Sequence, residues 1–385
     1  MKNNLWLVPG MFLAAAFLAT GTVQAQVPAD IEAQLIKIGH IVDPVCTAKL
    51  YRPMMPKNDI MSDVTPLYTG VTIARDVSFG PNPKDVVDVF TADQGPASRP
   101  VLIYVPGGGG NKIEMGDKEA NAFFDNIVRW ATENGMVGVL MQRHGLVPGA
   151  PPDYYAGAKD VSAMLQWVEA NISKYHGNPD RMFIWAHSAG NGPLGIYLGH
   201  PELYGPKGVG VQRVIFMSGQ FNIVREDGTN PVPPLAGGPG AGGNPVAGAG
   251  QACGAAVGGA GGGPGGGPGG PGGGAGGGAR GAAQQVPPEE LIKRSSLPVL
   301  EKTSVKIFLA SAELDPGADG KISPFNQAFH DELCKLDGPK AVDGKGHCPI
   351  LLFEKDESHM SEVFSIDTPD QTVSGPILKW LQSKE

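Results

Sequence analysis

A serine, an aspartate and a histidine in this sequence stand where they could act together on a carbonyl group. Ser188 lies in Ala-His-Ser-Ala-Gly, after the short apolar run 181–186. Small residues then begin a helical pattern, so Ser188 falls on a strand-to-helix turn of the nucleophile-elbow type. Such a turn strains the serine backbone and needs small neighbours, and Ala186 and Gly190 are both small, although the usual pattern has Gly at the first position. By itself the pentapeptide also fits a serine in an ordinary turn.

A serine nucleophile needs an imidazole base and a carboxylate that orients the imidazole. Asp315 and His359 supply these groups in the chain order Ser, Asp, His, each shortly after a strand-like run. Because the carboxyl ends of parallel strands share one edge of a sheet, we expect the three to meet there. The competing candidates are Glu313, Asp319 and Asp356 for the acid, and His187, His330 and His347 for the base. Position after a strand favours Asp315 and His359; His187 is expected to pack under the turn.

Residues 107–110 are four consecutive glycines that follow a buried-strand pattern. Acyl transfer needs backbone N–H groups aimed at the developing oxyanion, and we expect Gly108, Gly109 and Ala189 to provide them. The same run could be a plain turn or a phosphate-binding loop. However, no Lys-Ser/Thr follows it, and Lys112 stands where the third glycine of Gly-x-Gly-x-x-Gly belongs. Nucleotide binding is therefore disfavoured.

The elements that must position these residues alternate along the chain. The apolar patterns predict strands at 71–78, 85–90, 100–106, 136–141, 181–186, 211–217, 304–310 and 350–354, and helices at 30–39, 120–135, 155–175, 189–199, 324–336 and 375–382. A Gly-Pro turn joins the first two strands, which indicates an antiparallel hairpin at a sheet edge. The remaining alternation predicts an α/β fold, a mostly parallel central sheet with helices on both faces.

The N-terminus has the pattern of a cleaved secretory signal at residues 1–25, with an early lysine, a short apolar stretch and Val-Gln-Ala at its end. We expect an N-terminal helix and extended segment at 26–70, then one catalytic domain at 71–385, exported to a bacterial periplasm or beyond. No stretch is long and apolar enough for a membrane span. A net charge of −8 gives no electrostatic footprint for nucleic acid.

Residues 236–283 contain 25 glycines and almost no charge, so we expect a disordered insertion. Cys334 and Cys348 bracket a short polar loop and are the expected disulfide, while Cys253 either bonds to Cys46 or stays free. The sequence has no Cys-x-x-Cys and no His/Cys cluster of zinc spacing, so no metal site is expected.

Four stretches together resemble a known family: 76–90, 103–110, 178–190 and 309–316. They are similar to the carboxylesterases of the hormone-sensitive-lipase and feruloyl-esterase-like branch of the α/β-hydrolases. That family usually has His before the glycine run, where this chain has Pro106. The resemblance implies an α/β-hydrolase fold and hydrolysis of a small-molecule or polymer-attached carboxylic ester through an acyl-serine intermediate. It implies neither a metal nor an organic cofactor.

Tyr154, Tyr155 and Phe221 are candidates to face the acyl or alcohol group, and ordinary aromatic packing is an equally open interpretation. The glycine-rich insertion lies where the family carries lid elements, and we assign it only a tether or spacer role. Three other hypotheses stay open: an amidase or formamidase that uses the same residues, a non-catalytic secreted binding protein of the same fold, and an adhesive role for the insertion. The oligomeric state is left open.

Overall fold

The computed structural model describes residues 26–55, 60–61, 66–112, 123–144, 153, 155–219, 222–232, 253, 288–318 and 320–384. The predicted signal segment 1–25 and almost all of the predicted insertion 236–283 lie outside the described residues. So do Tyr154, Phe221 and Asp319.

The described strands form an eight-stranded sheet in the order β10-β9-β8-β7-β5-β6-β4-β3. Their bounds are β3 Val71–Ser78, β4 Val86–Ala92, β5 Arg99–Val105, β6 Val137–Met141, β7 Gly177–His187, β8 Arg213–Met217, β9 Lys306–Ala312 and β10 Ile350–Glu354. β4 runs antiparallel to β3 and β6, and all other neighbours are parallel. The predicted mostly parallel sheet with an antiparallel edge hairpin is thus confirmed. β1 (Ile60–Met61) and β2 (Pro66–Leu67) form a separate ribbon.

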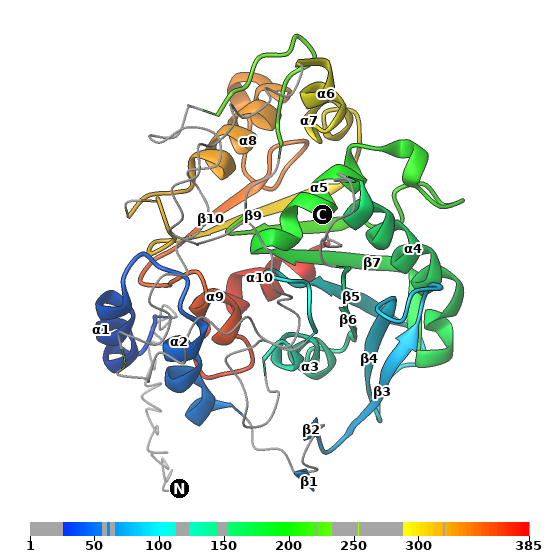
Figure 1. Cartoon of the computed structure of the whole chain (residues 1–385), viewed down its shortest axis with the longest axis vertical. Helices are drawn as coiled ribbons and strands as arrows, with labels where there is room; N and C mark the ends of the chain where they lie inside the picture. Colours follow the sequence, from blue (N-terminus) through cyan, green and yellow to red (C-terminus); the bar gives the residue numbers. More distant parts are fainter. Residues whose placement is uncertain are drawn as a thin grey trace, which may run out of the picture.

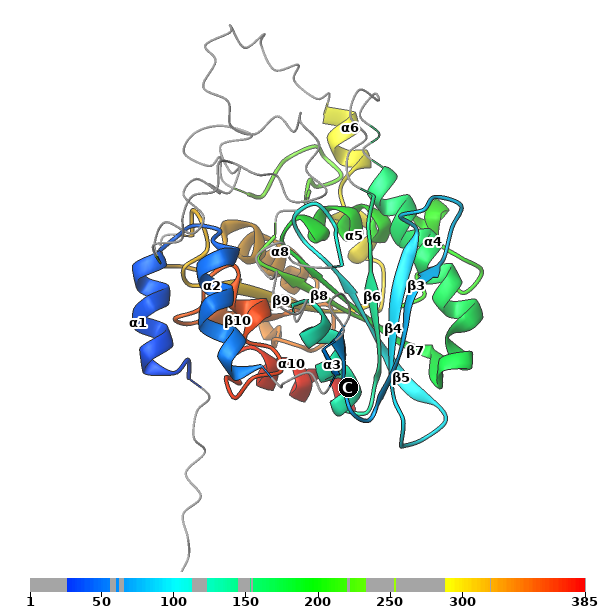
Figure 2. The ribbon, with the colours of Figure 1, turned by 60° about the horizontal axis from the view of Figure 1, so that its bottom comes forward.

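Helices cover both faces of this sheet (Figures 1 and 2). One face carries α1 (Ala29–Ile38), α2 (Pro44–Tyr51), α3 (Asp125–Glu133), α9 (Ser361–Phe364) and α10 (Ser374–Leu381). The other carries α4 (Ala156–Asn171), α5 (Asn191–Leu198), α7 (Leu297–Leu300) and α8 (Pro324–Lys335). α6 spans Pro288–Lys293, and short 3-10 turns occupy Arg52–Met54, Ile172–Tyr175, Ser188–Gly190, Pro201–Leu203 and Gly338–Lys340. The helices that sequence patterns did not predict, α2, α6, α7 and α9, span eight residues or fewer, too short for a clear helical period.

The central strands are buried on both sides because each contributes to two cores. Along β5, Leu102 and Tyr104 face the core under α3 and α10, whereas Val101, Ile103 and Val105 face the core under α4 and α5. All five are fully buried. This two-sided burial explains why β5 reads as a continuous apolar run and not as an alternating one.

The N-terminal helix α2 lies beside α9, and α1 lies beside α2 (Figure 1). Tyr51 at the end of α2 is fully buried, and its hydroxyl donates to Oδ2 of Asp370 over 3.2 Å. His40 follows α1 and lies with Nδ1 3.2 Å from the carbonyl oxygen of Asp315. A disulfide joins Cys46 in α2 to Cys253. The N-terminal segment therefore packs against the loop that follows β9 and the segment that follows α9.

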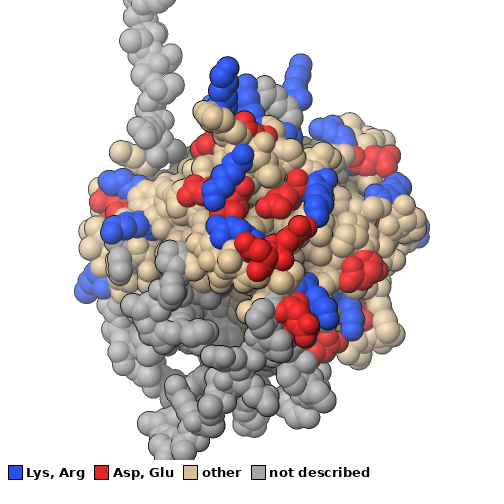
Figure 3. Space-filling view, turned by 90° about the horizontal axis from the view of Figure 1, so that it is seen from above, with Lys and Arg blue, Asp and Glu red and all other residues tan. Residues whose placement is uncertain are grey.

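None of the helices in the described ranges is long and apolar enough to cross a membrane. On the face viewed in Figure 3, basic and acidic side chains are interspersed among uncharged ones.

Candidate active site

The turn after β7 holds Ser188 in a conformation that few residues adopt. Ser188 has a φ of 52°, so the strained strand-to-helix turn expected from the sequence is present. A side chain at Gly190 would place its Cβ 2.5 Å from the carbonyl oxygen of Val105, which explains why only glycine fits there. Asn191 at the start of α5 donates to the carbonyl oxygens of Ser188 (2.9 Å) and Met217 (2.8 Å). These contacts fix the turn against the neighbouring strands.

Ser188, His359 and Asp315 lie in one hydrogen-bonded line. Nε2 of His359 is 2.8 Å from Oγ of Ser188, and Nδ1 is 2.8 Å from Oδ1 of Asp315. His359 and Asp315 are buried, with exposed fractions of 2% and 6%, whereas Ser188 is partly exposed. Because an ionised carboxylate only accepts, Nδ1 carries the hydrogen and Nε2 is left to accept the serine proton. The structure thus brings together the three residues that the sequence placed at this sheet edge.

The competing candidates have other partners. Oε2 of Glu313 accepts the backbone N–H of Asp356 over 2.8 Å, so these two acids stabilise a turn after β10. Nδ1 of His347 lies 3.1 Å from Oδ1 of Asp337 in an exposed loop. His330 lies beside the Cys334–Cys348 disulfide, away from the sheet edge.

A second layer of polar groups backs Asp315. Oγ of Ser218 lies 2.5 Å from Oδ2 of Asp315 and 2.7 Å from Oε2 of Glu362. A hydroxyl has one hydrogen, so Ser218 can donate to only one of two carboxyl oxygens. The other must itself carry a proton, and burial raises the pKa of Glu362 well above its usual range. Glu362 therefore donates to Ser218, which in turn donates to Asp315.

His187 packs under the elbow, as the sequence predicts. Its Nε2 lies 3.0 Å from the carbonyl oxygen of His359 and 2.8 Å from Oε1 of Glu362. Burial lowers the pKa of His187 well below its usual range, so the ring is neutral at pH 7. Since the His359 carbonyl only accepts, the hydrogen sits on Nε2. His187 thus holds the backbone of His359 and takes no part as a base.

The glycine loop lies against the elbow. A Cβ at Gly107 would fall 2.7 Å from Cβ of Ser188, so any side chain there would displace the serine. Gly110 closes a turn by donating its N–H to the carbonyl oxygen of Gly107 over 2.9 Å. Gly108 and Gly109, the two central residues of this turn, are exposed, as is Ala189 on the elbow.

Arg143 holds the glycine loop from behind. Its Nε donates to the carbonyl oxygen of Pro106 (3.0 Å), and its Nη2 lies 3.3 Å from those of Gly107 and Gly108. In a trans peptide the carbonyl and the following N–H point in opposite directions. Drawing the carbonyls of Gly107 and Gly108 toward Arg143 therefore turns the N–H groups of Gly108 and Gly109 away from it. Burial lowers the pKa of Arg143 to about 10, which leaves it charged at pH 7.

Sequence reasoning missed Arg143, Ser218 and Glu362. Two signals were present: Ser218 directly follows β8 at the same sheet edge, and Glu362 is three residues beyond His359. Tyr155 packs edge-to-face on His200 with ring centroids 4.9 Å apart, and its role in a substrate pocket stays a prediction. Cys334 and Cys348 form the expected disulfide, and Cys253 forms a disulfide with Cys46, one of its two expected states.

Residues 85–225 match the model of the carboxylesterase family. Over 109 residues the chain is 33% identical to a chlorogenic acid esterase of Aspergillus niger, covering 27% of this chain and 20% of that protein. Over 113 residues it is 30% identical to a fumonisin B1 esterase of Sphingopyxis macrogoltabida, covering 28% and 21%. The chain thus spans about a fifth of the length of these curated relatives.

The fold is similar to that of esterase B from Lactobacillus rhamnosis, with a TM-score of 0.51 and 13% identity over 92% of this chain and 95% of that one. The strand order, the two helical layers and this neighbour define an α/β-hydrolase fold. Within this fold, residues 85–225 are similar to the carboxylesterase family. The narrower hormone-sensitive-lipase and feruloyl-esterase-like branch stays a prediction.

Proposed function

We propose that this chain hydrolyses carboxylic esters through an acyl-serine intermediate. The observation that carries the proposal is the line from Oγ of Ser188 through the ring of His359 to Asp315, with 2.8 Å at each step. The carboxylesterase match supports ester over amide as the substrate bond. The esterase relatives are matched over about a fifth of their length, so the proposal rests on the geometry of this chain.

In the proposed reaction, Oγ of Ser188 attacks the ester carbonyl carbon while Nε2 of His359 accepts the hydroxyl proton. The carbonyl π pair moves to oxygen and forms a tetrahedral oxyanion. Collapse expels the alcohol, which takes the proton from Nε2, and leaves the acyl-serine. A water molecule then repeats the two steps and releases the acid. Asp315 orients the ring and stabilises the imidazolium that forms.

The N–H groups of Gly108, Gly109 and Ala189 are the proposed donors to the oxyanion. The geometry that supports this is the hold of Arg143 on the carbonyls of Gly107 and Gly108, which directs two of the three N–H groups away from the arginine. Donors fixed before the reaction need no reorganisation when charge develops, which is why such sites lower the barrier. In this chain Arg143 would serve in place of the histidine that usually precedes the glycine run.

The proposed place of action is outside the cytoplasm. The two disulfides, Cys46–Cys253 and Cys334–Cys348, support export because disulfides form and persist in oxidising compartments.

The test is hydrolysis of p-nitrophenyl esters from acetate to long acyl chains, with the matching p-nitroanilides in parallel. We expect turnover of esters, little turnover of anilides, and a loss of at least ~10⁴-fold in kcat/KM for Ser188→Ala. Ser173→Ala, at an exposed serine, is the matched control and keeps the wild-type rate.

A fluorophosphonate probe checks the nucleophile independently, since it should label the wild type and not Ser188→Ala. Equal rates for wild type and Ser188→Ala would refute the assignment. Faster anilide turnover would favour an amidase, and no turnover with no labelling would favour a binding protein of this fold.

A further inference from the structure

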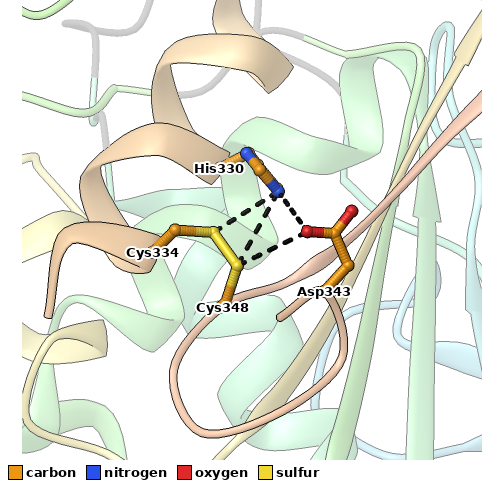
Figure 4. A group of neighbouring side chains, drawn as sticks. All are labelled: His330, Cys334, Asp343 and Cys348. Carbon is orange, nitrogen blue, oxygen red and sulfur yellow. Dashed lines mark hydrogen bonds and ion pairs between the residues drawn. A yellow bond between two sulfur atoms is a disulfide. The ribbon is translucent and has the colours of Figure 1, made fainter. Parts of the chain in front are cut away.

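A second group of reactive side chains lies between α8 and β10 (Figure 4). His330 and Cys334 stand one turn apart on α8, and Asp343 and Cys348 come from the following loop. Nε2 of His330 lies 3.3 Å from Sγ of Cys334, 3.8 Å from Sγ of Cys348 and 3.1 Å from Oδ1 of Asp343. Sγ of Cys348 is 3.7 Å from the same Oδ1. Four potential ligand atoms of zinc thus face one point.

We propose that the reduced protein binds one Zn²⁺ through His330, Cys334, Asp343 and Cys348. Zinc in proteins is tetrahedral, with bonds of about 2.0–2.3 Å to nitrogen, oxygen and sulfur, which puts neighbouring ligand atoms about 3.3–3.8 Å apart. The four separations above agree with that range to within about 0.3 Å. Two thiolates, an imidazole and a carboxylate are a ligand set that suits zinc.

The Cys334–Cys348 disulfide and a bound zinc ion exclude each other. Disulfide sulfurs are about 2 Å apart, whereas two thiolates on one zinc are about 3.7 Å apart. A dithiol reductant transfers two electrons to the cystine and is itself oxidised to a disulfide, leaving two thiols on the protein. Zinc then binds the two thiolates and their two protons go to solvent. In an exported chain, the cysteines are in this reduced state before the disulfides form.

The other ring nitrogen of His330 is also held. Nδ1 lies 3.1 Å from Oδ1 of Asp331, and a carboxylate on this nitrogen fixes the tautomer that leaves Nε2 free to bind a metal. Asp343 is exposed and His330 and Cys334 are partly exposed, so an ion can enter from solvent.

The loop that carries Cys348 is braced by contacts other than the disulfide. Oδ2 of Asp337 accepts the backbone N–H groups of His347 (2.8 Å) and Cys348 (3.0 Å). The carbonyl oxygen of Cys348 accepts from Gly344 over 3.0 Å. Reduction therefore leaves Cys348 close to α8. To bind one zinc, the two sulfurs need to move apart by less than about 2 Å.

The test compares full-length protein reduced with a phosphine with the oxidised protein. After removal of free metal, we expect about one zinc per reduced chain and none per oxidised chain. Co²⁺ added to the reduced protein should give the visible bands of a tetrahedral site with sulfur-to-metal charge transfer. His330→Ala should weaken zinc binding at least ~10-fold, and Asp343→Asn should weaken it less.

His347→Ala is the matched control, because His347 lies in the same loop and faces Asp337. It should bind zinc as the wild type does. A Cys46→Ser, Cys253→Ser background excludes the other cysteine pair, and if that background does not fold, the Co²⁺ spectrum of His330→Ala in the wild-type background decides. No zinc in the reduced wild type, or equal zinc affinity in His330→Ala, would overturn the proposal. Neither readout depends on esterase activity.

Discussion

Two histidines in this molecule have the same local arrangement and different surroundings. His359 has Asp315 on Nδ1 and the Ser188 hydroxyl on Nε2. His330 has Asp331 on Nδ1 and faces a carboxylate and two sulfurs with Nε2. In both, a carboxylate fixes the tautomer, and what lies at Nε2 then decides the chemistry. A hydroxyl there favours proton transfer, and the two thiols that reduction of the disulfide would leave there favour metal binding.

The two sites differ in what lies behind the carboxylate. Asp315 is buried and is backed by Ser218 and the protonated Glu362, so its charge is fixed in position. Asp331 is exposed, and Gln327 donates to it over 2.8 Å. Burial strengthens every charge interaction at the first site, whereas solvent screens those at the second. A proton relay needs the buried layer, and a metal site does not.

The largest expected effect separates His359, by activity, from a histidine of the disulfide loop. His359→Ala removes the base, and we expect kcat/KM for p-nitrophenyl acetate to fall by at least ~10⁴-fold. His347→Ala, an exposed histidine in the disulfide loop, should stay within about two-fold of the wild type. A small loss of kcat/KM in His359→Ala would mean that the hydrogen bonds of His359 to Ser188 and Asp315 serve the fold and not proton transfer.

A smaller effect tests whether Arg143 positions the glycine loop. Arg143→Lys keeps the charge, but an ammonium cannot reach the three carbonyls that the planar guanidinium spans. We expect kcat to fall ~10- to 100-fold with little change in KM, because displaced N–H donors matter in the transition state more than in the ground state. Arg181→Lys at an exposed position is the control. A rise in KM at constant kcat would instead point to a substrate-binding role.

The sequence predicts the first site better than the second for a physical reason. Ser188, Asp315 and His359 each follow a strand of one parallel sheet, and the topology of such a sheet brings strand ends to one edge. A residue's position directly after a predicted strand is therefore enough to place it at this edge of the sheet. Arg143 follows a strand as well, but its role depends on how far a long side chain reaches across the loop, which no spacing encodes.

The cluster around His330 combines a helix and a loop, which strand-end reasoning does not cover. His330 and Cys334 are four residues apart, so helical spacing puts them on one face, and this signal was present in the sequence. The expectation of no metal site rested on the absence of Cys-x-x-Cys and of a His/Cys cluster of zinc spacing in the sequence. The positions of Asp343 and Cys348 depend on the loop contacts of Asp337, which are tertiary.

The buried layer of the first site should also be visible in stability. Burial raises the pKa of Glu354, next to Glu362, to about 8. Between the ordinary carboxyl pKa of about 4.5 and pH 8 the unfolded chain loses this proton while the folded chain keeps it, so stability falls as pH rises. Glu354→Gln removes the titrating group. We expect its free energy of unfolding in urea to fall less than that of the wild type between pH 5 and 8.

Glu289→Gln, which alters an exposed carboxyl on α6, is the control and should keep the wild-type pH dependence. Parallel curves for the wild type and Glu354→Gln would show that Glu354 is not held neutral in the folded protein.

The smallest effect has the opposite sign and belongs to α8, the helix that carries His330. Arg225 donates from Nε (2.8 Å) and Nη2 (2.7 Å) to Glu332, and these bonds lower the pKa of Glu332 to about 2. The folded pKa lies below the unfolded one, so the stabilisation is complete above about pH 4.5 and is lost as pH falls toward 2. Because Arg225 is about one-third exposed, we expect Glu332→Gln to cost no more than about 1 kcal/mol at pH 7.

The measurement is urea unfolding of the wild type and Glu332→Gln at pH 7 and pH 3, with the exposed-site variant Asp331→Asn beside them. The difference between the wild type and Glu332→Gln should shrink at pH 3, while Glu354→Gln shows its divergence only above pH 5. The free energy of unfolding thus falls as the buried Glu354 approaches ionisation at high pH. It falls as Glu332, which is held by Arg225, approaches neutrality at low pH. If both variants changed in the same pH window and with the same sign, the contrast between a buried acidic layer and a solvent-screened ion pair would not hold for this molecule.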